Sequence, residues 1–490
     1  MKKNTMSEIK NLQPAAIWQN FDMLTQVPRP SGYMEKIQKF LLDWAKEKGV
    51  EAFQDKAGNI VMRKPASPGM EDRKIVTLQG HMDMVPQKTA DSTHNFETDP
   101  IQTYIDGEWV KAKGTTLGAD DGMAVATIMA IMEDNTLKHG PLEGFITVDE
   151  ESTMGGVNDM DCDTLKGDIL LNLDNETEGE MMIGSAGGVN LTATSEYKEI
   201  APEEGDAAIK VEIHQLRGGH SGLEINEGRG NANKMMARLV QDAIANFEAC
   251  LSTWHGGNMR NAIPRDCEVV LTLPKENVEA FVEVVDEWRE TFKGEYAAIE
   301  PAFTLTCEEV ALPNAIVPAE IQDALVNALC GCHNGVMRFI PEIPHIVETS
   351  SNLAIVEIDG GKVMFKVLVR SSRDSMRECC AETLESVFAM AGMKVELDGD
   401  YPAWQPNPNS EIVEVMKRVY LELFGKENKV QVVHAGLECG VIGAKYPNMD
   451  MVSFGPTMRS PHTPDERCHI PSVERYWQFV LSTLENTPKK

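Results

Sequence analysis

The sequence lacks any hydrophobic stretch long enough to cross a membrane. None of its apolar runs approaches the roughly 18 continuous residues that a membrane-spanning helix needs. The chain begins Met-Lys-Lys, but no apolar segment follows these lysines as it would in a secretory signal. We therefore expect a cytoplasmic protein with no membrane partner.

The ten cysteines lack the regular spacing of a disulfide framework. In a long chain without an export signal, scattered cysteines are typical of reduced thiols. The group formed by Cys330, Cys332 and His333 could bind a metal ion, but no second pair of ligands accompanies it, so ordinary thiols are favoured. The neighbours Cys379 and Cys380 are interpreted in the same way.

Basic residues are scarce relative to acidic ones. The chain has 46 Lys and Arg against 76 Asp and Glu, which gives a formal net charge of −30. Because this charge would repel the phosphate backbone of DNA or RNA, we expect no nucleic-acid partner. Most of the acidic side chains are expected to form a solvated surface, which leaves only a few for special roles.

The length of the chain favours two domains. At 490 residues it exceeds the size at which one hydrophobic core keeps growing. Strand-like runs at 74–79, 144–148 and 168–173 alternate with helical patterns, which predicts βαβ units and a mostly parallel sheet. The almost wholly apolar segment at 122–135 suits a buried helix.

The hydrophobic pattern of the sequence changes after GSAGGVN, near Gly187. Alternating stretches such as AIKVEIHQL are then separated by helical segments, which predicts an α+β insertion that closes at the connector DGDYPAWQPNPNS. We therefore expect an α/β fold, a mostly parallel mixed sheet flanked by helices, with an inserted α+β lid. The first domain would comprise 1–186 and 401–490, and the lid 187–400.

Five short segments carry metal-type ligands just beyond a predicted strand or at the start of the following helix. In an open α/β sheet, ligands bind at the edge formed by the carboxyl ends of the strands. Each segment alone is a weak signal, because a single His or Asp there is more often a capping or surface residue. Together they predict one site. They are GHMDMV with His81 and Asp83, GADDG with Asp120 and Asp121, TVDEES with Glu150 and Glu151, NLDNE with Asp174, and RSPHTPDE with His462.

The residue types indicate zinc. Two imidazoles with carboxylates suit a metal that accepts both nitrogen and oxygen, whereas calcium or magnesium would call for oxygen alone. Three carboxylates and a hydroxide would also balance the four positive charges of two zinc ions. This balance favours a site with two metal ions.

Eight segments spread over most of the chain carry a family resemblance. They are GHMDMV, THNFETDPI, GTTLGADDGMAVA, DEESTMGG, NLDNE, GGHSG, HAGLECG and SPHTPDE. Together they resemble the co-catalytic zinc metallopeptidases, a family that includes carboxypeptidase G, peptidase T, peptidase V and the aminoacylases. Within this family the chain is most similar to the bacterial aminoacyl-histidine dipeptidases, also called peptidase D.

The resemblance implies a role for each predicted ligand. His81 and Asp174 would hold one zinc ion. Glu151 and His462 would hold the other, and Asp120 would bridge the two. Co²⁺ or Mn²⁺ could substitute for zinc at these ligands.

Two more acidic residues complete the predicted site. Asp83 lies two residues from His81, so in an extended segment both side chains face the same way and the carboxylate can orient the imidazole. Glu150 points differently from its neighbour Glu151, which frees it to act as a general base that takes a proton from the attacking water and passes it to the leaving amine. The resemblance also implies a cis peptide bond after Asp120.

The identity of residue 174 helps to choose within the family. Deacylases and carboxypeptidases of the group tend to have Glu at this position, whereas aminopeptidases and dipeptidases have Asp, as here. We therefore expect hydrolysis of unblocked dipeptides, including Xaa-His peptides such as β-alanyl-histidine. The alternatives are an N-acyl amino acid deacylase and a catalytically silent scaffold, although a silent protein would not need Glu150 or Asp83.

The lid is expected to bind the substrate and to form a homodimer, although the family resemblance also allows a lid large enough to take the place of the partner within one chain. A dipeptide has a free carboxylate, which calls for a cation, and Arg370 is the candidate. The resemblance implies that His220 in GGHSG stabilises the oxyanion and that Asn261 in RNAIP is its polar neighbour. It also implies that His434 and Glu438 in HAGLECG line the substrate pocket, although the same segment could simply begin a helix.

Overall fold

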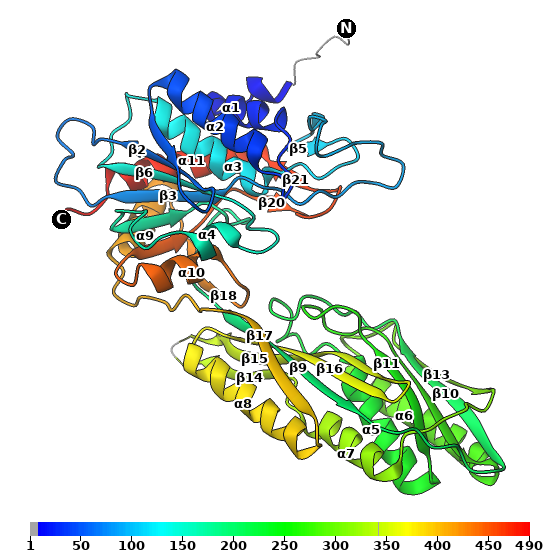
Figure 1. Ribbon diagram of the computed structural model, residues 1–490. Coiled ribbons are helices and arrows are strands. Elements are labelled where there is room, and N and C mark those ends of the chain that lie inside the picture. Colours follow the sequence, from blue (N-terminus) through cyan, green and yellow to red (C-terminus); the bar gives the residue numbers. More distant parts are fainter. Residues whose placement is uncertain (1–7, 342) are drawn as a thin grey trace. The chain divides into compact units, whose positions relative to one another are not determined.

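The chain folds into two compact units in the computed structural model, which describes residues 8–341 and 343–490 (Figure 1). The first unit comprises the chain up to Gly184 together with Trp404–Val432 and Leu437–Lys490, and the second comprises Ser185–Ala403 and Val433–Gly436. The division differs from the expected boundaries mainly at Val433–Gly436, which were expected to belong to the first domain.

A mixed sheet forms the centre of the first unit. Its strands are β1 (Glu51–Gln54), β2 (Ile60–Lys64), β3 (Val76–His81), β6 (Leu142–Thr147), β7 (Ile169–Asn172), β8 (Glu180–Ser185), β18 (Lys429–Val433) and β19 (Asp450–Ser453). The order across the sheet is β1-β2-β6-β3-β7-β19-β8-β18. β6, β3, β7 and β19 are parallel, so their carboxyl ends share one edge of the sheet.

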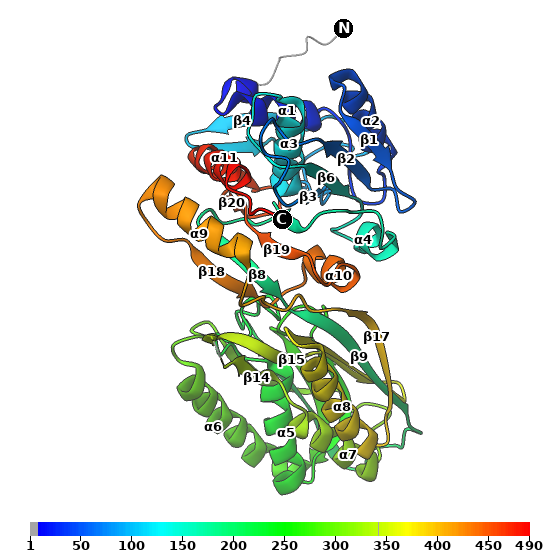
Figure 2. The same cartoon turned by 90° about the vertical axis from the view of Figure 1, so that its left-hand side faces the viewer.

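Helices cover both faces of this sheet (Figures 1 and 2). On one face, Leu78 and Ile146 share a core with α1 (Ala15–Thr25), α2 (Glu35–Lys48), α3 (Ala119–Glu133), α9 (Glu411–Phe424) and α11 (Ile470–Glu485). On the other face, Phe145 and Leu170 pack with α4 (Gly155–Asp159) and α10 (Glu438–Lys445). The central strands are therefore buried on both sides, as parallel strands usually are.

Local sequence explains where these helices begin and end. At the start of α9, the Ser410 hydroxyl accepts a hydrogen bond from the Val413 N–H at 3.1 Å, which satisfies a donor that has no partner within the helix. The helix ends at Gly425, whose φ of 65° is a left-handed conformation that glycine adopts without strain. An apolar stripe between these ends packs on the core.

A second, smaller sheet of the first unit presents the last predicted ligand. It contains β4 (Thr103–Asp106), β5 (Trp109–Ala112), β20 (Met458–Arg459) and β21 (Arg467–His469), in the order β20-β21-β5-β4. The connection between β20 and β21 carries His462. Pairing of β21 with β5 thereby fixes the base of this connection.

The second unit is an antiparallel sheet with helices packed against it (Figure 1). Its strands run in the order β13-β10-β12-β11-β15-β16-β9-β17, and β14 pairs with β15. The strands are β9 (Gly187–Glu196), β10 (Asp206–His214), β11 (Cys250–Gly256), β12 (Cys267–Pro274), β13 (Thr304–Val310), β14 (Gly335–Ile340), β15 (Ile343–Asp359), β16 (Lys362–Ser371) and β17 (Lys394–Tyr401). The helices are α5 (Ala232–Phe247), α6 (Val278–Tyr296), α7 (Ala319–Gly331) and α8 (Asp374–Met390).

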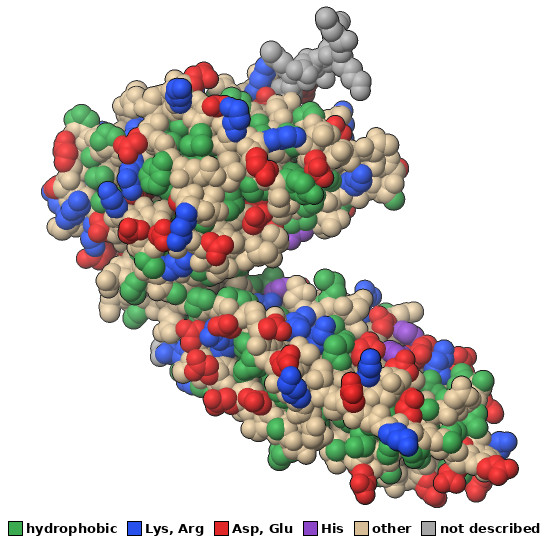
Figure 3. Space-filling model, in the orientation of Figure 1, with side chains coloured by type: hydrophobic (Ala, Val, Ile, Leu, Met, Phe, Trp, Pro, Cys, Tyr) green, Lys and Arg blue, Asp and Glu red, His purple; other side chains and the backbone are tan. Residues whose placement is uncertain are grey.

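The composition led us to expect a charged, solvated surface and reduced cysteine thiols. Acidic and basic side chains are mixed over the face seen in Figure 3, as a solvated surface requires. All ten cysteines are free thiols. The Cys332 thiol contacts the Leu329 carbonyl oxygen at 3.3 Å, and His333 Nδ1 lies 2.6 Å from Ser351 Oγ, so local groups already engage this cluster. Within residues 8–341 and 343–490, no helix is long and apolar enough to cross a membrane.

Removal of the Trp254 side chain should destabilise the second unit. Trp254 is fully buried, and its indole N–H donates to Asn233 Oδ1 at 3.1 Å. For Trp254→Ala we expect the free energy of unfolding to fall by about 3–5 kcal/mol, because a large cavity forms and a buried acceptor loses its donor. Met390 on α8 is 81% exposed, so Met390→Ala should change the free energy of unfolding by less than about 0.5 kcal/mol. Urea unfolding measures the stability of both variants. Equal unfolding midpoints for the two would contradict the predicted contribution of Trp254.

Candidate metal centre

The predicted ligands emerge at the shared edge of the parallel strands. His81 is the last residue of β3. Glu150 and Glu151 follow the end of β6, and Asp174 follows the end of β7. Because His81 is in register with the last residue of β6, these segments leave the sheet side by side.

The start of α3 brings a further pair of carboxylates to this edge. Asp120 and Asp121 lie in its first turn, where the backbone dihedral angles are not yet helical. The peptide bond between them is cis, as the family resemblance implied. The non-helical dihedral angles let the Asp120 side chain leave the regular path of the helix.

Asp120 stands between two imidazoles. His81 Nε2 lies 3.1 Å from Asp120 Oδ1 and 3.7 Å from Asp174 Oδ1. His462 Nε2 lies 3.1 Å from Asp120 Oδ2 and 3.0 Å from Glu151 Oε2. Each oxygen of one carboxylate thus faces a different ligand set, which is the arrangement that a bridging ligand requires.

The spacing of the donor atoms fits metal ions. Three groups of side chains offer ligand atoms that all lie within 4.8 Å of one another. Two ligands of a tetrahedral zinc ion are about 3.3 Å apart, given bonds of about 2.0–2.1 Å. The Glu151 Oε1 atom is also buried without a hydrogen-bond partner, as expected of an oxygen that faces a metal ion. The three groups are His81, Asp121 and Asp174; His81, Glu150 and Glu151; and Asp120, Glu151 and His462.

The charges of this cluster are strongly coupled. Hydrogen bonds to Asp120 and Glu151 raise the pKa of His462 to about 11. Burial raises the pKa of Asp174 well above its usual range, and the nearby carboxylates add to this effect. Protons therefore occupy the cluster in the metal-free protein, and any metal ion that binds must displace them.

Asp83 links one imidazole to the backbone that carries both glutamates. Its Oδ1 lies 3.4 Å from His81 Nδ1 and accepts the Glu150 N–H at 3.1 Å. Its Oδ2 accepts the Glu151 N–H at 3.3 Å and the Ser31 hydroxyl at 2.8 Å. A single buried carboxylate therefore fixes the relative positions of β3 and the segment after β6.

Glu150 has the electrostatic environment expected of a proton acceptor. Its side chain is 14% exposed, and its Oε2 lies 3.9 Å from His81 Nε2. Burial raises the pKa of Glu150 well above its usual range, and the carboxylates of Glu438 and Glu151 raise it further. A raised pKa makes the carboxylate a stronger proton acceptor.

Asp121 received no role from the sequence, yet it is fully buried in the cluster. Its Oδ2 accepts the His81 N–H at 3.2 Å and its Oδ1 accepts the Ala124 N–H at 3.3 Å. A side chain at Gly80 would not fit beside it, because a Cβ there would lie 2.4 Å from Asp121 Oδ2 and 2.5 Å from the Ala124 Cβ. Asp121 thus holds β3 against the start of α3.

Glu438 is the first residue of α10, so this part of HAGLECG does begin a helix. It is 1% exposed, and its Oε2 accepts hydrogen bonds from Gln79 Nε2 at 2.6 Å and from the Thr147 hydroxyl at 2.8 Å. Burial raises the pKa of Glu438 to about 7. Its place in the substrate pocket stays a prediction.

Three of the expected substrate-binding residues lie together in the second unit. Arg370 Nη2 is 3.4 Å from His220 Nε2, and Arg370 Nη1 donates to the Tyr401 hydroxyl at 2.8 Å. His434 Nε2 lies 2.7 Å from Ser350 Oγ. Burial and the charge of Arg370 lower the pKa of His220 to about 4 and that of His434 to about 3, so both rings are neutral at neutral pH.

Asn261 is exposed on the loop beside His220. Its carbonyl oxygen accepts the Ser221 N–H at 2.9 Å, and the next residue, Ala262, forms a β-bridge with His220. The backbone of Asn261 therefore supports the GGHSG segment.

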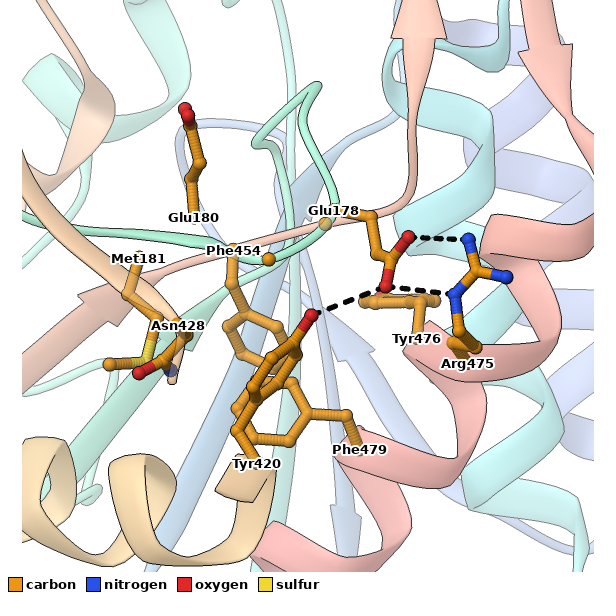
Figure 4. A pocket seen from close by; sticks show the side chains of 11 residues that line it. Glu178, Glu180, Met181, Tyr420, Asn428, Phe454, Arg475, Tyr476 and Phe479 are labelled. Carbon is orange, nitrogen blue, oxygen red and sulfur yellow. Dashed lines mark hydrogen bonds and ion pairs between the residues drawn. The ribbon is translucent and has the colours of Figure 1, made fainter. Parts of the chain in front are cut away.

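A separate small cavity of the first unit has a structural character (Figure 4). The Glu178 carboxylate accepts hydrogen bonds from Arg475 Nε at 2.9 Å and from the Tyr420 hydroxyl at 3.3 Å. The cavity holds about 10 Å³, enough for one water molecule. This cluster joins α9 and α11 to the segment after β7.

Comparison with known proteins identifies the family of this chain. The model of "Peptidase family M20/M25/M40" matches residues 77–486. The cytosol non-specific dipeptidase of Escherichia coli (strain K12) is 41% identical over 485 residues, which cover 99% of this chain and 100% of that protein. The crystal structure of aminoacylhistidine dipeptidase from Vibrio alginolyticus has 42% identity and a TM-score of 0.92, with 99% of each chain covered.

The likeness to a more distant structure supports the fold alone. Aminopeptidase PepT from Bacillus cereus is 16% identical, with a TM-score of 0.56 and coverage of 97% of this chain and 99% of that one. The α/β fold and the family resemblance expected from the sequence are confirmed. The chain belongs to peptidase family M20/M25/M40.

Proposed function

We propose that this protein is a metal-dependent dipeptidase that hydrolyses unblocked dipeptides, Xaa-His peptides among them. The observation that carries the proposal is the carboxylate of Asp120 between the imidazoles of His81 and His462, with a buried Glu150 beside them. Two relatives that match almost the whole chain are dipeptidases by name. These names, together with Asp at position 174, do not favour the alternative of an N-acyl amino acid deacylase.

The side chains in the first unit are suited to hold two zinc ions. His81 and Asp174 would bind one, Glu151 and His462 the other, with Asp120 shared, and Co²⁺ or Mn²⁺ could take the same ligands. Ions bound there would polarise the scissile carbonyl group and make the attacking water more acidic.

Glu150 would move the proton in this reaction. Its carboxylate would accept a proton from the attacking water and deliver it to the nitrogen of the leaving amine. Asp83 supports this role because it accepts the N–H of Glu150 while it contacts the His81 ring. The base and the metal ligands would thereby keep a constant separation through the proton transfer.

His220 and Arg370 are suited to bind negatively charged oxygens of the substrate. His220 Nδ1 accepts the backbone N–H groups of Gly222 and Leu223 at 3.2 and 3.1 Å, which leaves the ring proton on Nε2. That N–H lies beside the Arg370 guanidinium. Two neighbouring donors of this kind favour an oxyanion or a carboxylate over a neutral group.

Cellular location and assembly belong to the same proposal. We propose a cytoplasmic enzyme, since a relative that matches the whole chain is named as a cytosol enzyme. We also propose a homodimer through the second unit, on the strength of the family resemblance.

A substrate panel tests the function. The zinc-loaded protein should hydrolyse unblocked dipeptides, including β-alanyl-histidine, and should leave N-acetyl amino acids nearly untouched, because the proposed substrate has a free amine and a free carboxylate. Product amines can be followed by chromatography. Hydrolysis of the acetylated compounds alone would replace the dipeptidase proposal with the deacylase alternative.

Glu150→Ala separates proton transfer from metal binding. We expect kcat to fall by about 10²–10⁴-fold, because the general base is lost, while the metal content stays near that of the parent protein. Glu151→Ala is the matched control at the adjacent position, and it should lose metal as well as activity. Elemental analysis beside steady-state kinetics provides the comparison, and loss of zinc from Glu150→Ala would reverse the two assignments.

Arg370→Ala tests recognition of the substrate carboxylate. The parent protein should prefer a dipeptide to its C-terminal amide, and the variant should lose about 10–100-fold of that preference in kcat/KM, which is the value of a charge-assisted hydrogen bond. Arg373 lies three residues further along, with a side chain that is 48% exposed, and Arg373→Ala should keep the preference. An unchanged preference in Arg370→Ala would remove this residue from the proposed site.

A further inference from the structure

Two buried charged residues outside the predicted ligand set contact the backbone of the segments that carry the ligands. Arg29 lies between α1 and α2, and Glu466 lies in the connection between β20 and β21. Each is 2% exposed. Long charged side chains are almost never buried to this extent unless other groups engage them.

Glu466 accepts four consecutive backbone N–H groups ahead of α3 and in its first turn. Its Oε2 accepts those of Leu117 and Gly118 at 2.7 and 2.9 Å. Its Oε1 accepts those of Ala119 and Asp120 at 2.8 and 3.2 Å. The first N–H groups of a helix have no acceptor within the helix, so one carboxylate supplies an acceptor to the turn from which the Asp120 side chain projects.

Arg29 joins that same turn to the segment after β3. Its Nη1 donates to the carbonyl oxygens of Met82 and Asp83 at 3.0 and 3.1 Å. Its Nη2 donates to the Gly118 carbonyl oxygen. The planar guanidinium therefore spans two stretches of backbone, one directly after His81 and the other at Gly118, two residues before Asp120.

Two glycines of the LGADDG segment leave room for this guanidinium. A Cβ at Gly118 would lie 2.7 Å from Arg29 Nη2, and a Cβ at Gly122 would lie 2.5 Å from the same atom. Gly118 also has a φ of 68°, a left-handed conformation. Gly118 and Gly122, which lie on either side of the two aspartates, thus leave the space that Arg29 occupies.

From these contacts we infer that Arg29 and Glu466 are positioning residues, which set the distance from His81 to the bridging carboxylate of Asp120 before a metal ion binds. Glu466 lies in the same connection between β20 and β21 as His462, so its contacts also join the segment that carries His462 to Asp120. Burial lowers the pKa of the Arg29 guanidinium, and the negative charges of Glu466, Asp83, Asp121 and Asp120 oppose this effect. This inference rests on the proposed function in one respect, namely that metal ions bind at these ligands.

Glu466→Gln tests the inference with little change in shape. The new NH₂ group cannot accept a hydrogen bond, so the amides of residues 117–120 should exchange with solvent faster in the metal-free protein. Affinity for zinc, measured by competition with a chelating indicator, should fall by about 10–100-fold, as is typical when a residue that supports metal ligands is lost. The absorption spectrum of the Co²⁺-loaded protein should change, and kcat at saturating metal should fall more than KM rises.

Arg29→Lys is the second variant and decides the matter if Glu466→Gln does not fold. Lysine keeps the charge but lacks the planar fork that contacts both segments, so zinc affinity and the Co²⁺ spectrum should change in the same direction. The matched control is Glu143, which is also 2% exposed and accepts hydrogen bonds from the Thr77 hydroxyl and the Lys166 N–H at 3.1 and 2.8 Å. Glu143 lies at the opposite end of β6 from Glu150.

Glu143→Gln should lower the thermal midpoint of the protein without changing zinc affinity or the Co²⁺ spectrum. The inference is overturned if Glu466→Gln and Arg29→Lys keep the zinc affinity and Co²⁺ spectrum of the parent protein, or if Glu143→Gln alters them equally. Failure of the parent protein to hydrolyse any dipeptide would refute the proposed function, yet the comparison of metal affinities would still decide this inference.

Discussion

Mutual repulsion among buried carboxylates is the constraint on which this molecule depends. Asp120, Asp121, Glu150, Glu151 and Asp174 meet within a few ångströms, and burial with nearby negative charge raises the pKa of several of them. Such a cluster costs free energy unless cations or protons neutralise it. The protein must therefore hold these groups in place against their own repulsion, and the backbone N–H groups that bind Asp83 and Glu466 contribute to this.

Two carboxylates outside the predicted ligand set provide much of that support. Asp83 accepts the N–H groups of Glu150 and Glu151, and Glu466 accepts four N–H groups up to Asp120. Both act on backbone, so the ligand side chains stay free to face a metal ion. The parallel strands supply the frame, because their shared register brings the segments to one edge.

The sequence was most informative where a signal is local. Strand-like runs at 74–79, 144–148 and 168–173 correspond to β3, β6 and β7, since buried parallel strands are short apolar runs with a ligand-bearing segment directly after them. The buried helix expected at 122–135 corresponds to α3, because its almost wholly apolar sequence is also a local signal. Asp121 escaped a role because its partner, the His81 N–H, is a backbone group forty residues away in sequence.

Long-range partners could not be predicted in this way. Arg29 contacts backbone 53 to 89 residues further along, and Glu466 contacts backbone more than 340 residues before it. The residues around Arg29 do not distinguish it from a surface charge, and the segment SPHTPDE contains Glu466 without revealing the backbone groups that it contacts. The order of the strands was equally hidden, because β1 and β2 extend the sheet by antiparallel pairing that no local pattern specifies.

The brief return of the chain to the second unit at Val433–Gly436 has a practical meaning for protein engineering. A chimaera that exchanges only Ser185–Ala403 with a relative would carry over Ser350 but leave behind its partner His434. Recombination to transfer specificity between members of this family therefore has to move two separate pieces of sequence at once.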